Sequence, residues 1–258
     1  LAKGYEHPTQ LCLSSKRLYE IICKDADEYF SGKSNYERSF GRYFKVMPHD
    51  TSDYCKCERC QRLIKKDEEV EGYGFWSNKA SNYVWDFVNR IARYIKRKHP
   101  GKWVSCCAYA RYTGVPEFEL SDNIAVEVCR VLIGGIKDPK YKEYYRKVIK
   151  EWSKKVKRWY IWEYFDHIQM NGMECNFPGI FLKEIEEDVR FLKANGCKGM
   201  FNELNSGGGF IPNYAQDHLN VYVQLQLLNN AQLKVEEILN EYCRLFYGPA
   251  YKPLSLIH

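Results

Sequence analysis

Three acidic residues stand where apolar, β-prone runs of the sequence end. Asp50 follows the run YFKVM, Glu163 lies at the end of RWYIWEYF, and Glu203 follows KGMFN. In α/β proteins, ligands bind at the carboxyl ends of parallel strands. Hydrolysis of a glycosidic bond requires two carboxyl groups, one that donates a proton and one that attacks or activates water. We predict Asp50 and Glu203 as this pair and hold Glu163 as a third catalytic candidate.

Each acid also has a structural interpretation. An Asp in a turn often caps its own backbone, which would account for Asp50. Glu203 could instead hold the glycine-rich run that follows it, and Glu163 could pair with Arg111 or Arg158. The sequence leaves these alternatives open.

Aromatic residues gather near the same strand ends. The chain has 16% aromatic residues, with 21 Tyr and 6 Trp. Sugar rings stack on aromatic rings and form hydrogen bonds through their hydroxyl groups, although aromatic residues on strands more often fill a core. The predicted substrate-binding residues are His49, Tyr109, Tyr112, Trp162 and Tyr164.

The loop after Asp50 carries a second candidate site, the cysteine triplet Cys55, Cys57 and Cys60. Three thiols within six residues can bind a soft metal such as zinc, but a closed structural site needs four ligands. The candidates for the fourth ligand are Cys175, His49, Cys106 and Cys107. Packed thiols or a disulfide explain the triplet equally well. Glycosidic cleavage itself requires no cofactor, so a structural zinc is the one bound ion that the sequence suggests.

The composition narrows the class of protein. The chain has 258 residues, a mass of 30.6 kDa, 45% hydrophobic and 28% charged residues, and a net charge of +6. These values are typical of a globular protein, and the basic residues are spread among acidic ones. We therefore expect neither a nucleic-acid partner nor a membrane span. The eleven cysteines do not define a compartment.

Helical and extended patterns alternate along the chain. Helices are predicted at 11–29, 78–98, 140–155, 180–194, 214–228 and 235–246, and strands at 42–47, 103–109, 124–131, 158–165 and 198–202. The strand at 124–131 is interrupted by the polar residues Glu127 and Arg130. Ser14 and Ser15 are candidate caps of the first helix, and Pro100-Gly101 is predicted to end the second.

This alternation predicts an α/β fold with parallel strands and right-handed crossovers. An open sheet and a barrel both fit. We favour the carboxyl-terminal portion of a (β/α)8 barrel, with about five parallel strands in a single domain over residues 1–258 and carboxyl-terminal helices at 213–250. The chain begins without Met, and we expect further strands or a domain upstream of it.

Several motifs together resemble a bacterial domain of unknown function, numbered 4838. They are QLCLSS at 10–15, the HD pair before CxCxxC, WDFVN at 85–89, YIWEY at 160–164, GCKGMFNE at 196–203 and FYGPA at 246–250. The resemblance implies a barrel related to glycoside hydrolases of the hexosaminidase and α-glucuronidase type, a carbohydrate substrate, and a role in polysaccharide degradation. It matches Asp50 and Glu203 to the acids of that family. His49 stands where Asn is usual, and Glu163 where Asp is usual.

The alternative expectation is a carbohydrate-binding or degenerate hydrolase module that kept the cleft and lost the chemistry. Turnover of glycosides would distinguish the enzyme from this module. A metal or redox protein built on the cysteine triplet is the third hypothesis.

Overall fold

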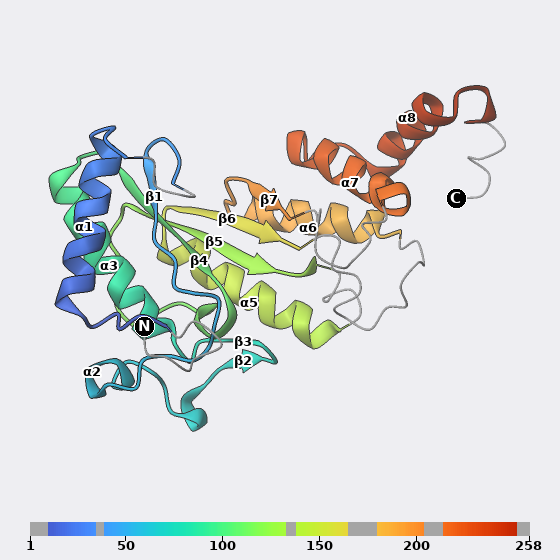
Figure 1. The fold of residues 1–258 in the computed structure, drawn as a ribbon. Helices are drawn as coiled ribbons and strands as arrows, with labels where there is room; N and C mark the ends of the chain where they lie inside the picture. Colours follow the sequence, from blue (N-terminus) through green and yellow to red (C-terminus); the bar gives the residue numbers. More distant parts are fainter. Residues whose placement is uncertain (1–9, 35–38, 133–137, 165–179, 204–213, 252–258) are drawn as a thin grey trace. The chain divides into compact units, whose positions relative to one another are not determined.

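A computed structural model describes residues 10–34, 39–132, 138–164, 180–203 and 214–251. Its contacts divide the chain into two compact units, the first formed by residues 1–130 and 140–162 and the second by residues 131–139 and 163–258 (Figure 1). The single domain expected from the sequence stays a prediction.

The first unit contains four strands of the main sheet and the helices between them. Its elements are α1 (Lys16–Phe30), β1 (Tyr43–Lys45), α2 (Glu58–Gln61), a 3₁₀ turn at Asp67–Glu69, β2 (Gly72–Tyr73), β3 (Trp76–Ser77), α3 (Ser81–Lys98), β4 (Trp103–Ala108), a 3₁₀ turn at Ala110–Tyr112, β5 (Ile124–Arg130), α5 (Pro139–Lys155) and β6 (Arg158–Glu163).

The sheet follows the order of the chain. Its hydrogen-bonded order is β1-β4-β5-β6-β7, where β7 is Met200–Asn202. β1 pairs in parallel with β4, and β4 pairs in parallel with β5, with Cys107 opposite Glu127. The predicted α/β class with five strands and flanking helices is confirmed. That these strands are the carboxyl-terminal portion of a (β/α)8 barrel is taken up below as a proposal.

Local signals define the helix ends. The Ser15 hydroxyl accepts a hydrogen bond from the Leu18 amide at 3.3 Å, so Ser15 caps α1 as predicted. Gly101 lies just after α3 and Gly196 just after α6 (Leu182–Ala194), with φ angles of +79° and +81°. Glycine adopts this left-handed conformation without strain, so Gly196 closes α6 directly after its cap Asn195. α3 ends at Lys98 because Pro100 disfavours a helical conformation of His99 and has no amide N–H.

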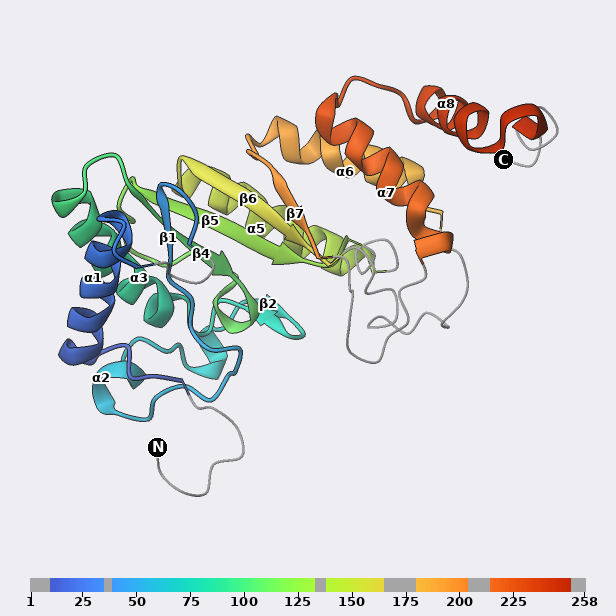
Figure 2. The same ribbon diagram turned by 45° about the horizontal axis from the view of Figure 1, so that its top comes forward.

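One face of the first unit's sheet is apolar and fully buried. Alternate residues of a strand point to opposite faces, and the buried set on this face is Phe44, Val46, Val104, Cys106, Ala108, Ile124, Val126, Val128, Trp159 and Ile161. α3 packs against β4, and the Tyr145 hydroxyl of α5 donates to the Cys129 carbonyl of β5 at 2.7 Å. Figure 2 shows α5 running along β5 and β6.

The two helices also meet through large aromatic side chains. The rings of Trp85 on α3 and Trp152 on α5 lie 4.7 Å apart. Their indole N–H groups donate to the carbonyls of Tyr112 and Thr113, at 3.3 and 2.7 Å. Each tryptophan thus buries a large apolar surface without losing a hydrogen bond.

The opposite face of this sheet is mixed. Ser105, Cys107, Ala125 and Cys129 are buried on it, and its other residues on these strands are aromatic or charged. We call it the polar face, and define it by the residues Tyr43, Lys45, Trp103, Glu127, Arg158, Tyr160 and Trp162. Except for Lys45, which is buried, these residues are half-buried, whereas the alternating residues of β6 on the apolar face are fully buried. The polar face therefore combines a buried strip on β4 and β5 with half-buried aromatic and charged groups.

A short hairpin was not predicted. β2 and β3 pair antiparallel through the two-residue loop Gly74-Phe75, in which Gly74 has a φ of +57°. Gly-X is a preferred sequence for such a loop, so GYGFWS carried a usable signal. Strands of two residues are nevertheless too short to show an alternating pattern.

The second unit has its own helical core. Its elements are α6, β7, α7 (Tyr214–Asn229), α8 (Val235–Tyr247) and a 3₁₀ turn at Gly248–Ala250. α6 and α7 lie side by side in Figures 1 and 2. Their buried aliphatic residues include Ile185, Val189, Val223 and Leu227. Across the described segments, no helix combines the length and apolar character that a bilayer crossing requires.

Candidate functional site

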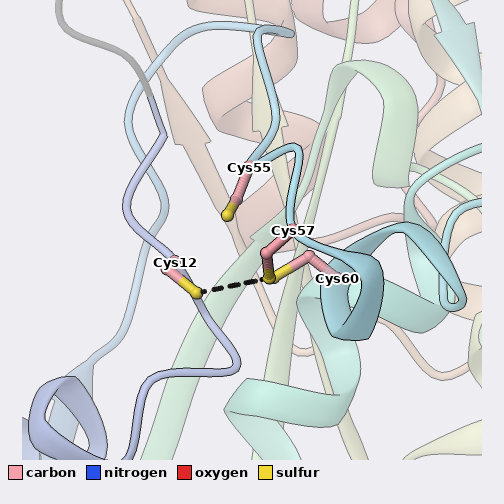
Figure 3. A group of neighbouring side chains, drawn as sticks. All are labelled: Cys12, Cys55, Cys57 and Cys60. Atoms are coloured by element: carbon pink, nitrogen blue, oxygen red, sulfur yellow. Dashed lines mark hydrogen bonds between the residues drawn. The ribbon is translucent and has the colours of Figure 1, made fainter.

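Four cysteine thiols converge in the first unit. Figure 3 shows Cys55, Cys57 and Cys60 together with Cys12, which lies ahead of α1. All four sulfur atoms lie within 4.8 Å of one another. The Cys12 sulfur is 3.8 Å from that of Cys57 and 3.7 Å from that of Cys60. Four thiols gathered in this way are a donor set that can hold a metal ion.

Hydrogen bonds from α3 hold the segment that carries Cys12. The Tyr83 hydroxyl donates to the Leu11 carbonyl at 3.1 Å and accepts from the Leu13 amide at 3.5 Å. The Arg90 guanidinium donates to the Leu13 carbonyl at 2.6 Å. The backbone is thus fixed on both sides of Cys12, so the thiol is presented to the loop without a covalent link.

The C-x-x-C turn provides amide hydrogen bonds to its own sulfurs. The backbone amide of Cys60 hydrogen-bonds the Cys57 thiol and, with the Cys60 side chain, lowers the pKa of Cys57 to about 7. Burial and hydrogen bonds from the neighbouring thiols raise the pKa of Cys12 to about 12. A single cluster therefore contains one thiol that ionises readily and one that stays protonated in the absence of a cation.

The fourth member of the cluster differs from every predicted fourth ligand. Cys106 and Cys107 are buried in β4 on opposite faces of the sheet, and His49 is exposed; all three lie outside the thiol group. Cys175 lies outside the described residues. One sequence signal pointed to Cys12, because it belongs to the motif QLCLSS. The distance in sequence from Cys12 to the triplet follows no known metal-binding pattern, however.

Gln10 fixes the loop on which Asp50 stands. Its buried side-chain amide donates to the carbonyls of His49 and Thr51, the latter at 2.8 Å, and accepts from the His49 amide at 3.0 Å. Its own backbone amide donates to the Asp53 carbonyl at 3.2 Å. The backbone is thereby held on both sides of Asp50, while the Asp50 side chain is exposed. Sequence reasoning missed Gln10 because its partners lie 39 and 41 residues away.

We expect Gln10→Ala to lower the free energy of unfolding by about 2 kcal/mol, because it removes three side-chain hydrogen bonds to a buried position. Hydrogen exchange at 49–53 should accelerate more than elsewhere. Urea unfolding and exchange mass spectrometry measure both effects. The control is Gln232→Ala at an exposed position, and equal behaviour of the two variants would show that the Gln10 contacts do not order the loop.

An ion pair crosses the polar face. The Lys45 ammonium lies 2.5 Å from a carboxylate oxygen of Glu127, and 5.4 Å from the ring centre of Trp162. Lys45 is 8% exposed and the Glu127 side chain 22%. The Cys107 thiol also donates to this carboxylate oxygen, at 3.6 Å. The sequence gives no sign that Lys45 is functional, because it is a single lysine within an apolar run and its partner Glu127 lies 82 residues away.

A second group on the polar face surrounds Arg158. Its guanidinium carbon stacks 4.0 Å from the ring centre of Trp103, and the group donates to the Tyr43 hydroxyl at 2.6 Å. The hydroxyls of Tyr43 and Tyr160 are 3.4 Å apart. Arg158 is thus held by a ring face and a phenol oxygen.

The predicted acids occupy different environments. Glu163 is fully buried, and one of its carboxylate oxygens accepts from the Leu132 amide at 2.7 Å. Glu203 is half-buried directly after β7, and its amide donates to the Glu163 carbonyl at 2.8 Å. Asp50 belongs to the first unit, and both glutamates belong to the second. The meeting of Asp50 with Glu203 stays a prediction. The glycine run after Glu203 lies outside the described residues.

The predicted aromatic residues also differ in exposure. Tyr112 is 3% exposed, which leaves little ring surface for a ligand. Tyr109 is half-buried and contacts Phe75 and Trp76, with ring centres 5.5 Å apart in each case. Trp162 is half-buried on the polar face, and Tyr164 is half-buried in the second unit. Their binding roles stay predictions.

Comparison with protein families places the chain. The model of the domain of unknown function DUF4838 matches residues 1–254. The chain belongs to the DUF4838 family. The match covers both compact units of this DUF4838 chain, including the cysteine cluster and the polar face. Neither a curated protein nor a solved structure matches the DUF4838 chain.

Proposed function

We propose that this DUF4838 chain forms the carboxyl-terminal strands of a (β/α)8 barrel that hydrolyses a glycosidic bond of an oligo- or polysaccharide. The observation that carries the proposal is the polar face. Four aromatic residues, Tyr43, Trp103, Tyr160 and Trp162, share it with a lysine, a glutamate and an arginine.

This combination suits a sugar. The C–H faces of a pyranose ring stack on aromatic rings, and its hydroxyl groups bond to charged side chains that are already oriented. Lys45 and Glu127 orient each other at 2.5 Å, and Arg158 is oriented by Tyr43 and Trp103. In a barrel, the inner face of the parallel strands leads to the mouth at their carboxyl ends, where ligands bind.

Asp50 and Glu203 are the proposed catalytic acids. Each follows a parallel-sheet strand at its carboxyl end, after β1 and β7 respectively. One carboxyl would protonate the leaving oxygen, and the other would attack the anomeric carbon or activate water. A separation of about 5 Å between the two carboxyls would give retention, and roughly 6.5–9.5 Å would give inversion.

The test begins with binding. The 258-residue chain is titrated with a panel of oligosaccharides by calorimetry and assayed on the matching aryl glycosides. We expect binding that weakens about tenfold in Trp162→Ala, because one stacking platform contributes about 1.5 kcal/mol. The control is Phe40→Ala, which removes a ring that is 86% exposed and lies outside the polar face. Binding that is absent from the whole panel, or equal in both variants, would contradict the proposal.

A non-catalytic carbohydrate-binding module is the second candidate. The buried Glu163 favours it, because this carboxylate is already bonded to the Leu132 amide and is removed from solvent. Such a module would bind the same sugars through the polar face and show no turnover. Comparing binding with turnover on one set of glycosides separates the two candidates.

A further inference from the structure

We infer that Cys12, Cys55, Cys57 and Cys60 bind one zinc ion that ties the segment before α1 to the loop after β1. In a tetrahedral site with zinc–sulfur bonds of about 2.3 Å, neighbouring sulfurs are about 3.8 Å apart. In the structure, the Cys12 sulfur lies 3.8 Å from that of Cys57 and 3.7 Å from that of Cys60. A disulfide would require about 2.0 Å. These two distances therefore match ligands around one ion, and all four sulfurs lie within 4.8 Å of one another.

The surroundings of the thiols favour thiolate ligation. The Ser14 hydroxyl lies 3.1 Å from the Cys60 sulfur, and the amides of Cys57 and Cys60 hydrogen-bond the sulfurs of Cys55 and Cys57. Such outer partners orient metal ligands and stabilise their negative charge. Cys60 is buried, and so are Leu13, which follows Cys12, and Tyr54, which precedes Cys55. Four soft sulfur donors in a closed arrangement select zinc over hard cations.

The position of the cluster gives it a structural role. Cys12 stands two residues after Gln10, whose side chain holds the backbone on both sides of Asp50. Cys55 to Cys60 lie on the same loop, just beyond Asp50. The ion would therefore close the loop at one end while Gln10 holds it at the other. The importance of this loop for catalysis rests on the proposed function, whereas the zinc site does not.

The test is the metal content of the full chain, purified under reducing conditions after expression with added zinc. We expect about one zinc per chain in the wild type, and a background amount in Cys12→Ser. The matched control is Cys197→Ser, a half-buried cysteine outside the cluster, which should keep its zinc. Replacement by Co²⁺ should give the intense visible bands of a tetrahedral thiolate site in the wild type. Ser14→Ala, which keeps all four sulfurs, should bind zinc about tenfold more weakly.

A second measurement tests the structural role even if Cys12→Ser does not fold. Removing the metal from the wild type with a chelator should speed hydrogen exchange at 49–57 at least about tenfold, and adding zinc should reverse the change. Metal-free wild type, an unchanged zinc content in Cys12→Ser, iron in place of zinc, or disulfides among the four cysteines would each overturn the assignment. Zinc without glycoside turnover would leave this inference standing and count against the proposed function alone.

Discussion

Asp50→Asn should reduce kcat/KM on a responsive aryl glycoside about a thousandfold, and Glu203→Gln should do the same. A positioned acid or base contributes roughly 10²–10⁴ to the rate of such reactions. The Asp50 side chain is exposed and Glu203 is half-buried, so neither substitution lies in the fully buried core. Thermal unfolding should therefore change little, and steady-state kinetics at the pH optimum gives the measurement.

Two matched variants separate chemistry from loss of charge. Asp53→Asn changes an exposed acid of the same loop, which pairs with Lys56 at 3.0 Å. Glu236→Gln changes an exposed acid of α8. Both should retain at least half of the wild-type activity. If Asp50→Asn and Glu203→Gln also retain at least half of the wild-type activity, these acids are not catalytic. Glu127 on the polar face then becomes the next carboxylate to replace.

Lys45→Met should lower the free energy of unfolding by about 3–5 kcal/mol. The substitution leaves the mostly buried carboxylate of Glu127 without its cation. The double variant Lys45→Met, Glu127→Gln should recover most of this loss, because it removes both charges. Urea unfolding of the two single variants and the double variant forms a double-mutant cycle that isolates the pair.

The reference for this cycle is an exposed pair. Lys16 and Glu20 lie one turn apart on α1 at 3.7 Å, with side chains that are 90% and 59% exposed, and Lys16→Met should cost less than about 0.5 kcal/mol. Burial by itself lowers the pKa of Lys45, but attraction to Cys107 and Glu127 outweighs it and raises the pKa above 10.5. The contribution of Lys45 should therefore be complete below pH 10.5 and be lost as the pH rises further. If Lys16→Met lowered the free energy of unfolding as much as Lys45→Met, burial would not make the Lys45–Glu127 pair more stabilising than an exposed pair.

The sequence by itself predicted the long helices and the strands of the main sheet. The apolar stripe that includes Tyr83, Val88 and Ile91 predicted α3, and the predicted helix at 140–155 matches α5 within one residue. These signals are local, because a helix is specified by residues three and four positions apart. The signals at Ser15 and Gly101 are local as well, because each residue affects the backbone conformation only within about one helical turn. The family, too, could be recognised from short motifs, and the match over residues 1–254 confirms it.

The tertiary structure decided which side chains meet. Cys12 and Cys57 are 45 residues apart, and Lys45 and Glu127 are 82 residues apart. No spacing rule connects such pairs, because their approach depends on how α1, β1, β4 and β5 pack together. Gln10 meets the backbone of His49 and Thr51 for the same reason. The sequence therefore supplied three of the four thiols and none of the contacts on the polar face, since a periodic pattern records which face of an element is buried and not what lies opposite it.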